Sequence, residues 1–216
     1  MCAPTSSEGS QPRRHARRCF EELRNTIASL DPEVVDEIAL SLADARAAGG
    51  RVFVVGLGGS AATATHFVAD LRRLTRIEAH APADNVPALT ARANDDGWEQ
   101  AYVACLEELS LRAEDVVVAI SVGGGDLARG VSVSLVRSFE AAGEHGCTRV
   151  AIVGRGGGEL APMADLAAIV PTVPGERGTF HTESLHLAIC HAIVSHPALQ
   201  VRKTLWEERT EAEAPV

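Results

Sequence analysis

The sequence contains no long apolar run. No stretch of it reaches the roughly 20 apolar residues that a membrane span needs. The N-terminal stretch MCAPTSSEGSQPRRHARR also lacks the apolar core of a signal peptide. We therefore expect no membrane partner and no export, and we place the chain in the cytoplasm.

Paired cysteines are absent as well. None of the cysteines forms a C-x-x-C pair, and the five are odd in number and widely spread: Cys2, Cys19, Cys105, Cys147 and Cys190. This pattern argues against a disulfide framework and against a zinc site built from thiolates. It indicates free thiols in a reducing compartment.

Positive charge is scarce too. The chain has 20 basic and 29 acidic residues, a net charge of −9, and no basic stripe with interleaved aromatic residues. Nucleic acid is therefore not expected as a partner. The one basic cluster, residues 13–18, is typical of the solvated start of a helix.

What the sequence does contain is a series of short β-branched runs, most of them closed by glycine or serine. They are apolar throughout rather than alternating, as is typical of strands buried on both faces. These runs occupy residues 51–56, 115–121, 149–154 and 167–171. Helical patterns occupy residues 12–29, 33–48, 60–75, 95–109, 131–144, 157–163 and 181–196.

This alternation of strands and helices predicts an α/β protein, a three-layer sandwich with a central parallel sheet between helices. The first two helices precede the first strand and form an N-terminal helical hairpin. A chain of 216 residues suits one domain with a sizeable core. We expect that single domain at residues 12–200, a disordered N-terminus at 1–11 and an acidic C-terminal tail at 201–216.

Three glycine-rich turns follow the strands, at residues 56–60, 121–126 and 154–159. They lie at the carboxyl edge of the predicted sheet, where ligands bind in such folds. None continues as G-K-[ST] or has an acid about twenty residues on to hold a ribose, so no nucleotide cofactor is expected. Two turns carry a serine, Ser60 and Ser121, and backbone N–H groups and hydroxyls there can converge on a phosphate-sized anion.

Polar residues also stand where a core is expected. His66 and Asp70 are four residues apart on one helix face and could grip one metal ion or one substrate hydroxyl. A second apolar helix, from residue 181 on, carries Glu183, His186, His191 and His196.

Glu183 and His191 are about 12 Å apart along a continuous helix. One straight helix therefore cannot easily bring both residues to a single ion. Either Glu183 lies before the helix proper, or the site takes residues from two chains.

Several segments together resemble the SIS (sugar isomerase) domain and, within it, the phosphoheptose isomerases. They are GLGGSAATATHFVADL, DNVPALTARANDDGWE, AISVGGGD, VSVSLVRSFEAA, AIVGRGGGELAPMAD and HTESLHLAICHAIVSHP, in this order along the chain. The SVGGG and HTE…SHP segments resemble one subgroup of SIS proteins more than the enterobacterial type.

The resemblance implies a homotetramer with active sites between subunits. It implies ketose–aldose isomerisation of a sugar phosphate through an enediol, assisted by one zinc ion per site. The family motif places the zinc ligands at His66, Asp70, Glu183 and His191. Asp70 and His191 then form the favoured proton-transfer pair, with Glu183 as the base if Asp70 is mainly a ligand.

The same resemblance assigns the substrate-binding positions, which are Gly59, Ser60, Asn94, Asp95, Ser121, Gly123, Gly124 and Ser132. Two of its positions depart from the family pattern. Asp70 stands where the better-known members have glutamate, and Asp126 adds negative charge to a phosphate loop that has lost hydroxyl groups. Ser132, Ser134 and Arg129 are candidates to restore the missing donors.

The expected reaction converts sedoheptulose 7-phosphate to D-glycero-D-manno-heptose 7-phosphate, or acts on a related sugar phosphate of higher carbon number, such as an octulose phosphate. The alternative is a non-catalytic SIS regulator that binds a sugar phosphate. Such a regulator should carry a basic helix-turn-helix, for which the chain has no room outside the core.

Overall fold

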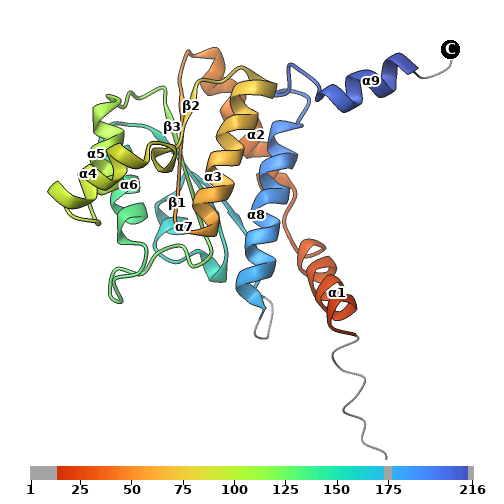
Figure 1. Ribbon diagram of the computed structural model, residues 1–216, viewed down its shortest axis with the longest axis horizontal. Coiled ribbons are helices and arrows are strands. Elements are labelled where there is room, and N and C mark those ends of the chain that lie inside the picture. The colour runs from red at the N-terminus through yellow and green to blue at the C-terminus, as the bar shows by residue number, and fades with distance from the viewer. Residues whose placement is uncertain (1–13, 173–176, 214–216) are drawn as a thin grey trace, which may run out of the picture.

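The computed structural model describes residues 14–172 and 177–213 (Figure 1). Five strands form one parallel sheet in the order β2-β1-β3-β4-β5. The strands are β1 (Val52–Gly56), β2 (Ala79–His80), β3 (Val116–Ser121), β4 (Thr148–Val153) and β5 (Leu166–Ile169). The predicted parallel sheet is confirmed. Only β2 was missed, because two residues are too few to show a pattern.

The central strands β1, β3 and β4 are mostly apolar because each of them contributes side chains to two cores. Successive side chains of a strand point to opposite faces. In β3, Val116, Val118 and Ile120 belong to one buried cluster, whereas Val117 and Ala119 belong to the other. The three-layer sandwich follows directly from this alternation.

The first core is covered by three helices, α2 (Glu33–Ala47), α3 (Gly59–Asp70) and α8 (Gly178–Val194). The second core is covered by α5 (Ala101–Glu108), α6 (Val133–Glu144) and the short α7 (Leu160–Met163), with α4 (Val86–Asp95) packed beside α5. The two layers therefore lie on opposite sides of the sheet (Figure 1).

The helix predicted over residues 95–109 is wrong in its extent. Only α5 lies within that range, α4 ends at Asp95, and Gly97 between the two helices has a φ of +83°. The sequence did not predict α4, which begins at Val86 because the Asn85 side chain caps it by accepting a hydrogen bond from the Ala88 N–H group. The helix predicted over 60–75 changes at Leu71 into a turn of π-helix, η3 (Leu71–Thr75).

Both N-terminal helices are present, and each packs against α8. The first of them, α1 (His15–Ile27), stands out from the body beyond one end of α8 (Figure 1). Glu22 fastens it there, since its carboxylate accepts hydrogen bonds of 2.7 and 2.5 Å from Arg177 and lies 3.0 Å from His181 Nε2. The Arg177 guanidinium holds the pKa of Glu22 well below its usual range.

The segment expected as an acidic tail contains a helix, α9 (Leu205–Glu213), that projects from the body (Figure 1). The disorder expected at residues 1–11 lies outside the described residues. Of the cysteines, Cys19, Cys105, Cys147 and Cys190 are free thiols. Among the described helices, none is long and apolar enough to cross a bilayer.

Candidate active site

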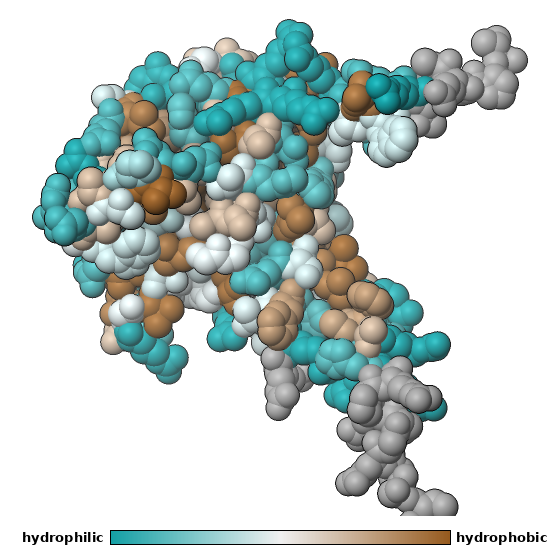
Figure 2. All heavy atoms as spheres, viewed as in Figure 1, coloured by the Kyte–Doolittle hydropathy of each residue, from teal (hydrophilic) through white to brown (hydrophobic). Residues whose placement is uncertain are grey.

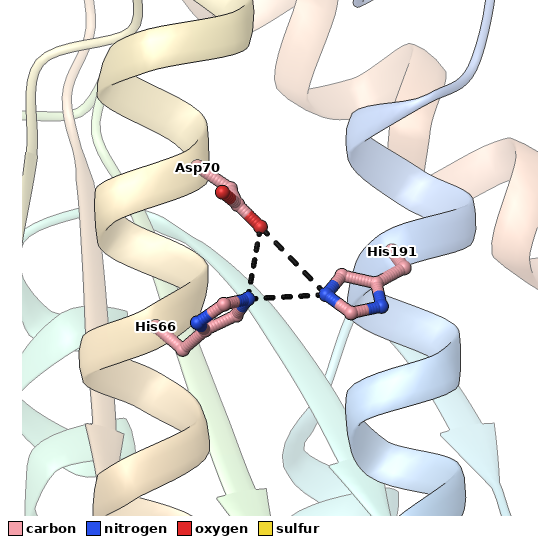
Figure 3. A group of neighbouring side chains, drawn as sticks. All are labelled: His66, Asp70 and His191. Carbon is pink, nitrogen blue, oxygen red and sulfur yellow. Dashed lines mark hydrogen bonds and ion pairs between the residues drawn. The ribbon is translucent and has the colours of Figure 1, made fainter. Parts of the chain in front are cut away.

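His66 and Asp70 on α3 face His191 on α8 across the gap between the two helices (Figure 3). His66 Nε2 lies 3.1 Å from His191 Nε2 and 3.2 Å from Asp70 Oδ2, and His191 Nε2 lies 3.8 Å from Asp70 Oδ2. Within the described ranges, these residues form the one group of three or more potential metal ligands.

Helix periodicity explains why these side chains point outward. Phe67, Val68 and Leu71 are buried in the first core, so the face of α3 that carries them lies against the sheet. The opposite face of α3 therefore points away from the sheet. His66 and Asp70, four residues apart, share that outward face. On α8, Ile189 and Cys190 are buried in the same core, so that His191 points toward α3.

The three donor atoms fit a metal ion. Ligands of a tetrahedral zinc ion, each about 2.0–2.1 Å from the metal, lie about 3.3 Å apart. The observed separations of 3.1, 3.2 and 3.8 Å are close to that value. Two imidazole nitrogens and one carboxylate oxygen are a ligand set that zinc commonly takes, and three ligands leave one position open.

Glu183 does not join this group within one chain. It lies inside α8, which runs unbroken from Gly178 to Val194, so the alternative in which Glu183 precedes the helix is excluded. Its carboxylate lies instead against the start of α3, where a Cβ at Gly59 would come within 2.6 Å of Glu183 Oε1. Glycine at position 59 is what allows this approach.

The predicted phosphate end lies at the carboxyl edge of the strands. Ser60 and Ser121 are both buried there, and the Ser121 hydroxyl accepts a hydrogen bond of 3.1 Å from the Gly124 N–H group. Gly124 has a φ of +71°, and a Cβ on it would lie 1.9 Å from the Gly157 carbonyl oxygen. The second and third glycine turns therefore pack backbone against backbone.

The Asp126 carboxylate interacts with Arg129 of its own loop. Its Oδ1 accepts a hydrogen bond from the Arg129 N–H group, and its backbone forms an isolated antiparallel bridge with Val131. Ser132, half-buried with a φ of +53°, precedes α6, and the hydroxyl of Ser134 is buried without a hydrogen-bond partner in the described residues. A Cβ on Gly123 would meet no atom within 4 Å.

Asn94 and Asp95 are not brought to the other predicted site residues. Both are exposed at the end of α4, where the Asn94 amide donates a hydrogen bond of 2.9 Å to Asp95. That helix lies on the opposite side of the sheet from α8 (Figure 1).

A cleft of about 610 Å³ opens beside the His66–Asp70–His191 group. Sequence reasoning missed one of its walls, which consists of Ser195, Gln200, Lys203, Thr204 and Glu207. Ser195 is the first residue of the SHP motif, and Gln200 is the last residue of the domain expected at 12–200. Lys203, Thr204 and Glu207 lie in the segment that was expected only as an acidic tail. No spacing signal could have found them, because their place depends on how the chain folds back after α8.

His186 is a second residue whose environment the sequence did not reveal. Its side chain is fully buried on α8, and neither ring nitrogen has a hydrogen-bond partner among the described residues. Burial lowers the pKa of His186 to about 4. The imidazole is therefore neutral at pH 7.

The family model described as "SIS domain" matches residues 17–154. The chain belongs to the SIS domain family. A phosphoheptose isomerase of Chlorobaculum tepidum is 33% identical over 180 residues, covering 80% of this chain and 81% of that protein. The lincomycin biosynthesis protein LmbN of Streptomyces lincolnensis is 36% identical over 187 residues, covering 83% of this chain and 68% of that protein.

Solved structures agree with this assignment. Phosphoheptose isomerase GmhA of Neisseria gonorrhoeae superimposes with a TM-score of 0.71 at 28% identity, covering 86% of this chain and 96% of that one. The resemblance to the phosphoheptose isomerase branch of the family is thereby confirmed in sequence and in fold.

Proposed function

We propose that this SIS-family sugar-phosphate isomerase interconverts sedoheptulose 7-phosphate and D-glycero-D-manno-heptose 7-phosphate. The observation that carries the proposal is the His66–Asp70–His191 group at the edge of a cleft. An aldose–ketose isomerase needs a base beside the substrate carbon and an acid beside the oxygen. This group offers both.

In the proposed reaction, the Asp70 carboxylate takes a proton from C1 of the ketose, and the electron pair forms the C1–C2 double bond of the enediol. The His191 imidazole donates a proton to O2 and then takes the proton of the O1 hydroxyl. Asp70 returns its proton to C2, which leaves the aldehyde at C1. Glu183 is the alternative base.

The donor set of His66, Asp70 and His191 supports zinc as the metal of this site, with Glu183 of a neighbouring subunit as the fourth ligand. A zinc ion on His191 Nε2 would take the place of the imidazole proton there, and it would then supply the stabilisation of O2 that this proton gives in its absence. It would polarise the substrate oxygens and so favour loss of the C1 proton. The role of the protein residues is to hold the carboxylate and the imidazole on the same side of the cleft.

The spacing along α3 supports a substrate with a phosphate at one end and a carbonyl at the other. At 1.5 Å per residue, His66 lies about 9 Å and Asp70 about 15 Å along the helix from Ser60. We propose that Ser60, Ser121 and the second glycine turn hold the phosphate. An octulose phosphate has the same two ends and is the second substrate to test.

We also propose that the active sites are completed between subunits of a cytoplasmic homotetramer. Glu183 does not reach the His66–Asp70–His191 group in its own chain, and Asn94 and Asp95 lie across the sheet from it. Phe20, Ile27 and Phe180 are exposed, and Figure 2 shows hydrophobic surface where α1 lies beside α8. Burying these side chains between copies would stabilise an assembly.

The test is NMR of sedoheptulose 7-phosphate incubated with the protein and one equivalent of zinc in D₂O. The proposal predicts appearance of the aldose phosphate with deuterium at C2, since the proton passes through an exchangeable group. Binding of the sugar phosphate without any C–H exchange would instead establish the non-catalytic regulator.

A further inference from the structure

Lys203 is the only lysine of the chain, whose other 19 basic residues are arginines. It lines the same cleft as His66, Asp70 and His191. We propose that Lys203 is a further catalytic residue, whose ammonium group stabilises the negative charge that develops on the substrate carbonyl oxygen. This inference rests on the isomerase function proposed above.

The backbone that carries Lys203 is fastened to the helix that carries Asp70. The N–H groups of Val201 and Arg202 both donate hydrogen bonds to the Leu74 carbonyl oxygen, at 2.8 and 3.0 Å. Leu74 lies in η3, the π-helical turn that continues α3, one turn beyond Asp70. Lys203 therefore directly follows a residue, Arg202, whose backbone is hydrogen-bonded to the continuation of α3.

Arg46 on α2 also links η3 to the segment that leads to Lys203. Its Nη1 donates hydrogen bonds to the carbonyl oxygens of Thr75 (2.9 Å) and Leu199 (2.6 Å), and its Nη2 donates to Ala198 (3.1 Å). One guanidinium thus joins the end of η3 to the segment before Lys203. The backbone that leads to Lys203 is therefore fixed beside the cleft, so that the flexible lysine side chain starts from a defined position at its edge.

Lys203 supplies a positive charge to a cleft whose other permanently ionised groups are negative. The cleft wall carries two carboxylates, Asp70 and Glu207, and Lys203 is its one side chain with a permanent positive charge. When Asp70 removes the C1 proton, the electron pair shifts and negative charge grows on O2. An ammonium is a compact charge with three N–H donors, which suits an oxygen whose position changes during the reaction.

No bond to Lys203 forms or breaks in this step. Its N–H donates a hydrogen bond to O2 while the C1 proton passes to Asp70 and the electron pair moves into the enediolate. The lysine proton stays on nitrogen, and His191 supplies the proton that neutralises O2.

The first test compares Lys203→Met, which removes the charge but keeps the length, with Lys203→Arg, which keeps the charge. Arg202→Met is the matched control, because that neighbouring cation is exposed and does not line the cleft. We expect Lys203→Met to lower kcat for sedoheptulose 7-phosphate about 10²-fold. KM should change much less, Lys203→Arg should recover part of kcat, and Arg202→Met should match the wild type.

The second test uses the fact that there is one lysine to label. An amine-reactive reagent can modify Lys203 and the α-amino group, and mass spectrometry separates the two peptides. Saturating sedoheptulose 7-phosphate should slow labelling of Lys203 and leave that of the α-amino group unchanged. This readout does not depend on turnover.

The outcomes separate the two proposals. Wild-type kcat in Lys203→Met, or labelling of Lys203 that ignores the substrate, overturns the role of Lys203 and leaves the isomerase function intact. A wild-type chain that binds sedoheptulose 7-phosphate but never converts it overturns the isomerase function, and the role of Lys203 with it.

Discussion

The candidate site has two ends, the glycine turns with Ser60 and Ser121 and the reacting end with His66, Asp70 and His191. The two ends differ in how deeply a single chain buries their side chains. At the glycine-turn end, Ser60 and Ser121 are only 4% and 5% exposed, and the backbone packs closely around them. At the reacting end, the side chains of His66 and His191 are 51% and 53% exposed. Folding of one chain buries the first end, whereas it leaves the side chains of the second end half exposed.

This difference predicts two kinds of mutant. Changes at the reacting end should abolish turnover and leave the fold intact, because those side chains make few contacts on which stability depends. Changes at the glycine-turn end should first cost stability, because backbone atoms there are in direct contact.

The largest effect is expected from Asp70→Asn. Loss of the proton-transferring carboxylate should lower kcat by about 10³-fold or more, while the thermal midpoint stays close to that of the wild type. Zinc content measured on the same samples should also fall, because a ligand has been weakened. Asp44→Asn, the same change at an exposed position of α2, is the control and should alter neither quantity.

Gly124→Ala should be the most destabilising change at the other end. The added Cβ would overlap the Gly157 carbonyl, and the φ of +71° strains any L-residue. We expect the free energy of unfolding to drop by about 3 kcal/mol in urea titrations. Gly123→Ala has open space and no positive φ, so a drop of similar size there would show that backbone contact is not the cause.

His186 lies between the two ends on α8, and its substitution should change how stability depends on pH. Its folded pKa of about 4 is below the usual value of 6.5, so the unfolded chain binds more protons between these values. Stability is therefore lost as the pH falls through this window, by about 3 kcal/mol at most.

Replacing His186 with leucine should remove that loss, so that the variant outlasts the wild type at pH 4.5 in thermal denaturation. His15→Leu, at an exposed position of α1, is the matched control. Equal acid sensitivity of wild type and His186→Leu would mean that the imidazole finds a proton acceptor when the protein is acidified.

Ser121→Ala should give the smallest effect on stability. It removes one hydrogen bond to the Gly124 N–H group, which is worth about 1 kcal/mol. If Ser121 also binds the phosphate, KM for sedoheptulose 7-phosphate should rise while kcat stays nearly constant. A change in kcat alone would contradict phosphate binding by Ser121, because it would indicate a role at the reacting carbons.

The sequence was sufficient for the sheet, since apolar runs such as 116–121 cannot be exposed on either face. It was also sufficient for His66 and Asp70, because helix geometry puts residues four apart on one face. His191, in contrast, comes from a helix more than a hundred residues later. Periodicity shows that such a residue is out of place in a core but not which side chains it meets, so that only the family resemblance grouped His191 with His66 and Asp70.

The position of Lys203 lay beyond sequence reasoning for a related reason. It depends on Arg46 and on the Leu74 carbonyl, two partners distant in sequence whose hydrogen bonds only the folded chain defines. The break between α4 and α5 was missed because Gly97 was read as part of a helix, although a glycine with positive φ ends one.

The most direct measurement of the central claim is a crystal structure of the zinc-loaded protein soaked with sedoheptulose 7-phosphate. The account predicts phosphate beside Ser60 and Ser121, and C1 and C2 of the sugar beside Asp70 and His191, with zinc on the His66–Asp70–His191 group. A sugar phosphate bound elsewhere, or bound with its phosphate at the histidines, would contradict it.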